Sequence, residues 1–105
     1  MTTVTFFKSA DLICGFEISG HSGYSTDGSD IVCAAVSSAA YMTANTITDI
    51  LHINAAVTED DGLMLLRMSS QDALKAKDIM SGLKHHLTAL SEQYKKFLKV
   101  RFSEV

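Results

Sequence analysis

His21 and Cys33 are the residues of this sequence whose types and spacing could support chemistry between side chains. They lie twelve positions apart, on either side of a segment rich in glycine and hydroxyl groups. A cysteine thiolate attacks carbonyl carbons, and a histidine can accept the thiol proton and return it to a leaving group. The pair therefore predicts a Cys-His dyad suited to nucleophilic catalysis.

The position of Cys33 supports this chemistry. A helix is predicted to begin just before it, with Ser29 or Asp30 as the N-cap. Unpaired N–H groups and the positive end of the helix dipole at such a start favour the thiolate over the thiol. Backbone N–H groups around Val32 and Cys33 could also hold the oxyanion of a tetrahedral intermediate. Ser37, one turn further on the same face, is assigned a supporting role.

Two of these supporting residues have an alternative explanation. Asp30 could orient His21 as a third catalytic member, or it could only cap the helix, and the two roles are compatible. Ser37 could hydrogen-bond near the thiol, or it could bond back to a carbonyl of its own helix. The sequence leaves both alternatives open.

The segment Gly20–Ser29 contains His21 and leads toward Cys33. It reads GHSGYSTDGS and is too polar and too rich in glycine for a helix or a strand. It predicts a surface loop beside the candidate site. Tyr24 in this loop could contact a substrate, or it could pack on the sheet.

The elements that must position these residues follow from hydrophobic periodicity and turn signals. Alternating apolar residues predict strands, apolar runs with a period of three to four predict helices, and Ser69 with Asp72 predicts a helix cap. Strands are expected at 4–7, 12–18, 51–57, 63–68 and 98–103, and helices at 30–51 and 70–97, the second starting after the Ser69 cap. This order, ββαββαβ, predicts an α+β fold, a two-layer sandwich with a mixed sheet and both helices on one face.

Cys14 is expected to differ from Cys33. It falls in the second predicted strand, where strict alternation places it on one face with Leu12, Phe16 and Ile18. Free cysteine is among the most buried residue types, so Cys14 is interpreted as an inert core thiol.

Composition narrows the class of protein. The 105 residues show no break in composition, which predicts one domain over 1–105. A net charge of -3 without a basic stripe disfavours nucleic acid as a partner, and the N-terminus predicts neither a signal peptide nor a membrane span. Two cysteines without a secretory signal favour reduced thiols and a cytoplasmic location. No cofactor is expected, since the glycine-rich loop matches no nucleotide-binding motif.

A metal site is not expected either. His85 and His86 are adjacent on a predicted helix and point in different directions, and His52 is predicted to face outward from a strand. No Cys-x-x-Cys or His-x-x-x-His pair occurs.

One string in the sequence is more specific than the dyad alone. Gly20-His21, followed by Gly28-Ser29-Asp30-Ile31-Val32-Cys33-Ala34-Ala35-Val36-Ser37, resembles the signature of the ribosomal-processing cysteine protease (Prp) family. The resemblance implies that Cys33 is the nucleophile and His21 the general base. It implies a substrate loop that includes Gly20, Ser22, Gly23, Tyr24 and Gly28.

The same resemblance implies a substrate and an assembly. Members of this family are homodimeric endopeptidases that remove an N-terminal extension from large-subunit ribosomal protein number twenty-seven, after a pair of aromatic residues. Two positions depart from the family pattern: Ser22 stands where alanine is more common, and Ala39 where leucine commonly follows the helix serine. They bear on loop packing and substrate fit and leave the dyad intact.

Two other functions fit the same residues. In the first, the chain is a non-enzymatic ribosome-associated interaction module and Cys33 is a small residue in an alanine-rich helix. In the second, the dyad serves a thioesterase or acyltransferase that accepts acyl thioesters rather than peptides. Thiol reactivity distinguishes the first alternative, and a substrate panel distinguishes the second.

Overall fold

A computed structural model describes residues 1–20, 29–60 and 62–105, with the backbone alone described for Ser29 and Asp30. The elements are β1 (Thr2–Ser9), β2 (Leu12–Ser19), α1 (Ser29–Asn45), the π-helical turn η1 (Thr46–Ile50), β3 (Ala56–Asp60), β4 (Leu63–Arg67), α2 (Ser70–Lys75), α3 (Lys77–Gln93) and β5 (Leu98–Glu104). The predicted succession of strands and helices is confirmed, with one additional short helix, α2.

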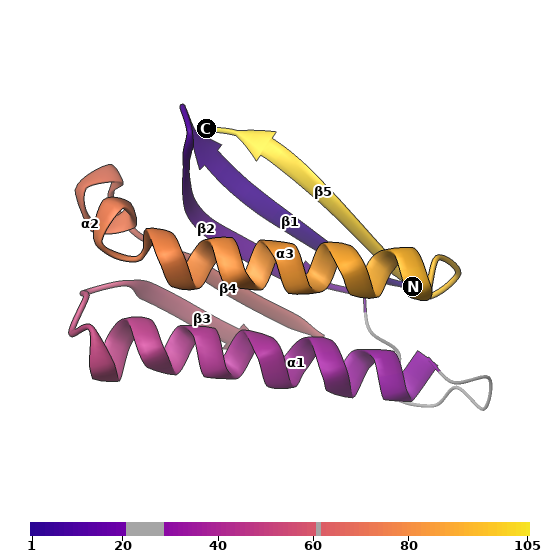
Figure 1. The fold of residues 1–105 in the computed structure, drawn as a ribbon. Coiled ribbons are helices and arrows are strands. Elements are labelled where there is room, and N and C mark those ends of the chain that lie inside the picture. The colour runs from indigo at the N-terminus through magenta and orange to yellow at the C-terminus, as the bar shows by residue number, and fades with distance from the viewer. Residues whose placement is uncertain (21–28, 61) are drawn as a thin grey trace.

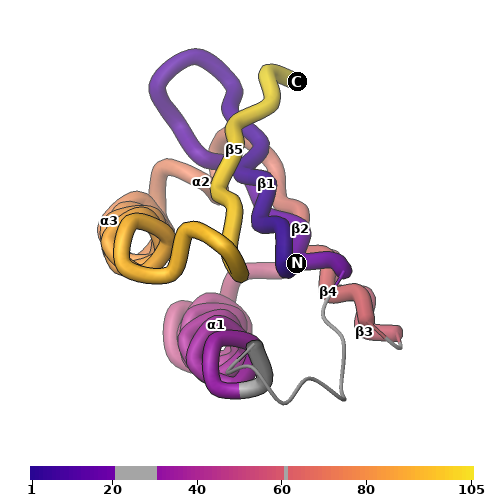
Figure 2. Tube along the Cα trace, turned by 90° about the vertical axis from the view of Figure 1, so that its right-hand side faces the viewer, coloured from indigo at the N-terminus to yellow at the C-terminus, as the bar shows by residue number. Residues whose placement is uncertain are grey.

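The described strands form one mixed sheet in the order β3-β4-β2-β1-β5. β5 is parallel to β1, whereas the other neighbouring pairs are antiparallel. Helices α1 and α3 lie beside each other on one face of this sheet, as the two orthogonal views show (Figures 1 and 2). The predicted two-layer α+β sandwich is therefore confirmed.

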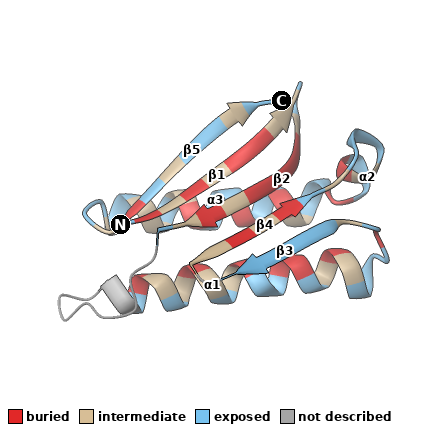
Figure 3. Ribbon diagram, turned by 180° about the vertical axis from the view of Figure 1, so that it is seen from behind, coloured by how far each residue is buried: buried red, intermediate tan, exposed pale blue. Residues whose placement is uncertain are grey.

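The core lies between the sheet and the two long helices. In α1 the buried residues recur every four positions, which places one stripe of the helix against the sheet. Figure 3 shows that burial is concentrated in the central strands, while the edge strand β3 is exposed along its length. The principal core residues are Val4, Phe6, Phe16, Ile18, Leu66, Val32, Val36, Ala40, Met80, Leu83 and Leu87.

A β-bulge interrupts the first hairpin. Phe7 lies opposite Gly15, but Lys8 lies opposite Ile13, so Cys14 is the extra residue of β2 at this point. A bulge adds one residue to one strand and changes which side chains point to which face beyond it.

The bulge overturns one prediction about the faces of β2. Phe16 and Ile18 are in the core as expected, but beyond the bulge Ile13 joins them and Leu12 does not. Strict alternation through Cys14 was the wrong assumption for this strand. Cys14 is nevertheless buried, as predicted.

The segment after α1 also differs from expectation. The predicted strand 51–57 is wrong at its start, because residues 51–55 are irregular and β3 begins at Ala56. The Ile53 N–H donates to the Ile47 carbonyl across 2.9 Å, and His52 has a positive φ of 55°. His52 therefore lies in the turn that closes η1, not on a strand.

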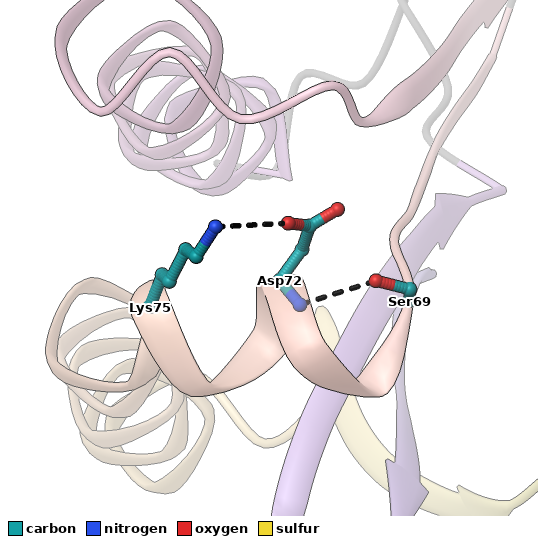
Figure 4. A network of polar contacts seen from close by, with 3 residues as sticks. All are labelled: Ser69, Asp72 and Lys75. Carbon is teal, nitrogen blue, oxygen red and sulfur yellow. Dashed lines mark hydrogen bonds and ion pairs between the residues drawn. The ribbon is translucent and has the colours of Figure 1, made fainter.

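The predicted long helix 70–97 is divided. α2 and α3 are separated at Ala76, whose φ of -99° and ψ of 11° depart from helical values, and α3 ends at Gln93. The predicted cap at Ser69 is confirmed for α2: its side chain accepts a hydrogen bond of 3.1 Å from the Asp72 N–H (Figure 4). Lys75 lies 3.9 Å from the Asp72 carboxylate in the next turn.

By length and composition alone, the stretch Ile31–Ile50 could cross a membrane. The core helix of a globular domain has the same character, and here Val32, Val36 and Ala40 of this stretch are buried in the core. Other apolar residues of the stretch, Ile31, Met42 and Ile50, are exposed.

Candidate active site

Cys33 is the fifth residue of α1, which begins at Ser29. Its thiol is half-buried and free, beside the buried stripe that includes Val32. Because Ser29, one of the two predicted caps, is already the first residue of the helix, the Cys33 N–H falls within the helical hydrogen-bond ladder, and the unpaired donors belong to residues before it. Cys33 is therefore placed to present its side chain rather than its own backbone N–H.

The thiol of Cys33 has one polar contact that connects it to the sheet. The hydroxyl oxygen of Thr2 lies 3.1 Å from the Cys33 sulfur. Thr2 is the first residue of β1 and only 2% exposed. The two residues are 31 positions apart in sequence, so packing of α1 on the sheet creates this contact.

Cys14 has a different environment. It is buried within the β-bulge, and its sulfur has a weak contact of 4.0 Å with the Leu12 carbonyl. Of the two thiols, Cys33 is the one that solvent and a reagent can reach.

Gly20 marks the end of the described chain before the candidate loop. Its φ is +81°, and a Cβ built on it would lie 2.7 Å from the Met1 carbonyl oxygen. The end of β2 therefore approaches the start of β1, next to Thr2 and hence next to the Cys33 thiol. Glycine fits here because the conformation is left-handed and the backbones are close.

Several residues singled out in the sequence lie outside the described residues. These are His21, Ser22, Gly23, Tyr24 and Gly28. The backbone of Asp30 is helical in α1, but its side chain is outside the description, so its two alternative roles stay open.

Ser37 lies one helical turn after Cys33 and is half-buried. It lines a small cavity of about 50 Å³ between α1 and strands β2, β3 and β4. The remaining lining residues are Ile18, Tyr41, Glu59, Asp60, Leu63 and Met64. The cavity is lined by both apolar and polar residues, and those from α1 lie one to two turns along the helix from Cys33.

Tyr41 lines this cavity and is bonded to another of its lining residues. Its hydroxyl donates a hydrogen bond to the Glu59 carboxylate on β3. That hydrogen bond, with minor contributions from desolvation and the negative charge of Glu59, raises the pKa of Tyr41 above 10.0. No pattern in the sequence predicts this pair, because the residues are separated by 18 positions and belong to different elements.

The remaining three histidines lie outside the candidate site around Cys33. His52, His85 and His86 are exposed. Among residues 1–20, 29–60 and 62–105, no group of three or more His, Cys, Asp or Glu side chains is arranged to hold a metal ion.

Comparison with known proteins identifies the family. The family model described as cysteine protease Prp matches residues 1–99. The chain belongs to this family. The signature residues Gly20-His21 and Gly28 to Ser37 lie inside the matched region, and the chain is accordingly a cysteine protease of the Prp family. No curated protein matches the sequence.

Solved structures agree with this assignment at the level of the fold. SMU.848 from Streptococcus mutans has a TM-score of 0.89 and 23% identity, with 100% of this chain and 99% of that chain covered. The essential ribosomal processing protease Prp from S. aureus, in complex with a substrate peptide, has a TM-score of 0.88 and 21% identity, with coverage of 98% and 100%. The same S. aureus protease with a covalently linked product peptide has a TM-score of 0.84 and 22% identity, with the same coverage.

Thr2 is a neighbour of the candidate Cys33 thiol that the sequence did not reveal. A threonine at the start of an alternating strand carries no local signal of a contact with a distant thiol. Only the register that packs α1 on β1 brings its hydroxyl to the thiol.

Proposed function

We propose that this protein is an endopeptidase that removes the N-terminal extension of large-subunit ribosomal protein number twenty-seven, with Cys33 as nucleophile and His21 as general base. The observation that carries the proposal is the family match over residues 1–99, which includes both members of the dyad. In the S. aureus relative, the protease is a ribosomal processing enzyme and was solved with a substrate peptide.

The proposed reaction has two stages. His21 accepts the thiol proton of Cys33, the sulfur bonds to the scissile carbonyl carbon, and the C–N bond breaks as His21 protonates the leaving amine. Water, deprotonated by His21, then attacks the thioester carbon, the S–C bond breaks, and the proton returns to the Cys33 sulfur. N–H groups at the start of α1, up to Val32, would stabilise the oxyanion in both stages.

Two features of the described residues support this assignment. Cys33 is accessible at its position on α1, whereas Cys14 is buried. Gly20, the residue before His21, approaches Met1, and Met1 precedes the residue that contacts the Cys33 thiol. Both features favour a dyad built across the start of β1.

The location and assembly of the protein are part of the same proposal. We expect a cytoplasmic homodimer, because the family resemblance implies a dimer and the two thiols are free. Sedimentation equilibrium of the purified chain tests the dimer directly, and a mass of one chain at micromolar concentration would contradict it.

Cleavage of the precursor tests the function. The precursor of ribosomal protein twenty-seven from the same organism is incubated with wild type, Cys33→Ala, Cys14→Ala and His21→Gln, and products are identified by intact mass. Wild type and Cys14→Ala should cleave at one bond, Cys33→Ala should not cleave, and His21→Gln should lose roughly 100-fold or more in rate. Absence of cleavage by wild type would overturn the processing role.

An acyl thioester panel separates the remaining alternative with the same dyad. A peptidase should cleave the precursor peptide and leave simple acyl thioesters unchanged at the same enzyme concentration. Turnover of thioesters without turnover of the peptide would assign the dyad to an acyl hydrolase or transferase instead.

A further inference from the structure

Thr2 is a buried polar residue whose hydroxyl has no assigned purpose in the fold. Its backbone N–H already donates to the Phe97 carbonyl across 2.9 Å, which fixes the start of β1 beside β5. Its side chain is 2% exposed, and a buried hydroxyl is unfavourable unless it finds a hydrogen-bond partner. The partner here is the sulfur of Cys33, at 3.1 Å.

The other buried polar residue in the described part of the chain, Thr43, shows how a buried hydroxyl is usually hydrogen-bonded. The hydroxyl of Thr43 bonds back to the Ala39 carbonyl of its own helix at 2.8 Å. Such a bond is local and needs no tertiary partner. The Thr2 hydroxyl, in contrast, is directed across the interface between β1 and α1 at the atom that would attack the substrate.

We propose that Thr2 is a further catalytic residue, whose hydroxyl donates a hydrogen bond to the Cys33 sulfur and so stabilises the thiolate and fixes its orientation. This inference rests on the proposed function of Cys33 as nucleophile. In the thiol form either atom can be the donor. In the thiolate form the sulfur carries no proton, so the hydroxyl must donate, and a hydrogen bond to a charged acceptor is the stronger one.

The contact also has a consequence during the reaction. Once the sulfur is bonded to the acyl carbon, it loses its negative charge and becomes a poor acceptor. The Thr2 hydrogen bond is therefore strongest in the free thiolate, and it favours the poised nucleophile and its return after hydrolysis. No proton leaves Thr2 at any step.

The experiment measures the rate at which Cys33 reacts with a small aromatic disulfide as a function of pH. All variants carry Cys14→Ala, so that Cys33 is the only thiol that can react. Thr2→Val replaces the hydroxyl by a methyl group of the same shape and keeps the backbone bond to Phe97. Thr3→Val, the next residue on the opposite face of β1, is the matched control.

The proposal predicts a crossing of the two pH profiles. Loss of a charge-assisted hydrogen bond should reduce the thiolate fraction about tenfold on the acidic side of the profile. A more basic thiolate is intrinsically more nucleophilic, with a Brønsted slope of about 0.4–0.5. The Thr2→Val rate should therefore be roughly 3-fold lower at low pH and roughly 3-fold higher on the alkaline plateau. A purely structural role would not produce this crossing.

A conservative substitution that keeps the hydroxyl tests whether the hydroxyl itself is responsible. Thr2→Ser keeps the hydroxyl and should restore the wild-type profile, and Thr3→Val should leave it unchanged. Thr2→Ala removes the same hydroxyl and carries the same prediction if Thr2→Val does not fold. The Met1 ammonium and Asp30 are the titratable groups nearest in sequence to Thr2 and Cys33, and they are identical in all variants, as is the proposed base His21. Differences between profiles therefore report on Thr2.

The outcomes separate this inference from the proposed function. Superimposable profiles for Thr2→Val and wild type, or an equal shift in Thr3→Val, would overturn the role of Thr2 even if the precursor is cleaved. A crossing profile restored by serine supports the role of Thr2, and in the precursor assay it should accompany a roughly 3-fold loss of kcat/KM at neutral pH. A crossing profile without any cleavage would instead contradict the peptidase while leaving the contact established.

Discussion

The hydroxyl of Tyr41 on α1 donates a hydrogen bond to the carboxylate of Glu59 on β3. β3 is one of the two edge strands of the described sheet and is exposed along its length. The bond therefore links the helix that carries Cys33 to an edge strand, and both of its residues line the cavity that Ser37 also lines. It joins two elements at the protein surface.

The first prediction concerns the titration of Tyr41. Glu59 raises the pKa of Tyr41 chiefly by accepting its hydrogen bond. Glu59→Gln removes the charged acceptor and should lower the pKa of Tyr41 toward 10.0. Tyrosinate absorbance as a function of pH measures the change, and Glu92→Gln on α3 is the control. An unchanged tyrosine titration in Glu59→Gln would show that the bond does not persist in solution.

The same bond determines the direction in which stability should change with pH. The pKa of Tyr41 is higher in the folded than in the unfolded chain. The contribution of the Tyr41–Glu59 bond to the free energy of unfolding is therefore fully present below pH 10.0 and is lost as pH rises through the folded pKa. Thermal unfolding between neutral and strongly alkaline pH should show a steeper loss of stability for wild type than for Tyr41→Phe. Equal slopes would contradict the linkage.

The second prediction concerns Gly15, next to the bulge in β2. A Cβ at this position would lie 2.1 Å from the Leu66 carbonyl oxygen on β4, a backbone atom that cannot move without separating the strands. Gly15→Ala should therefore destabilise the protein by about 3 kcal/mol or more. Chemical denaturation measures the loss.

Gly82 on α3 is the matched control for this substitution. Nothing lies within 4 Å of a Cβ built there, and its backbone is helical. Gly82→Ala should stabilise the protein by about 0.5–1 kcal/mol, because alanine is the better helix former. Opposite signs for the two substitutions are expected, and a neutral Gly15→Ala would show that β2 and β4 can separate at little cost.

The sequence predicted most of the fold because its elements have clear periods and turn signals. Predictions from the sequence were wrong where a bulge or a helix break interrupts the regular alternation or periodicity. The bulge at Cys14 shifts the buried face of β2 from Leu12 to Ile13, and strict alternation cannot reveal an inserted residue. Likewise, the break at Ala76 falls in a run of good helix formers, where no glycine or proline marks it.

The candidate site was predicted in part for the same reasons. Cys33 could be assigned to the start of a helix because Ser29 and Asp30 precede an apolar run. Its contact with Thr2 could not be predicted, because it depends on how α1 packs on β1 across 31 positions. The pair Tyr41 and Glu59 depends in the same way on the position of β3, whose start the sequence placed too early.

The third prediction concerns the cap of α2. The Ser69 side chain accepts a hydrogen bond from the Asp72 N–H, which would otherwise be unpaired at the helix start. Ser69→Ala should cost about 1 kcal/mol of stability. Ser70→Ala, one residue later and exposed, is the matched control and should change stability by less than about 0.5 kcal/mol. Equal losses in the two variants would contradict a specific role for the cap.

The fourth prediction compares the two thiols. Cys33 is half-buried on α1, whereas Cys14 is buried within the β-bulge and becomes reachable only when the hairpin opens. With iodoacetamide at neutral pH, Cys33 should be modified about 100-fold faster than Cys14, as expected if local opening at Cys14 costs about 3 kcal/mol.

Peptide mapping after partial alkylation identifies the modified thiol, and Cys33→Ala reports the rate of Cys14 alone. In denaturant the two rates should converge, because protection of Cys14 depends on the fold. Faster modification of Cys14 would contradict the burial described here. A Cys33 thiol that is unreactive at neutral pH while the fold is intact would favour the non-enzymatic interaction module, because a nucleophile must be both reachable and ionised before it can attack a peptide bond.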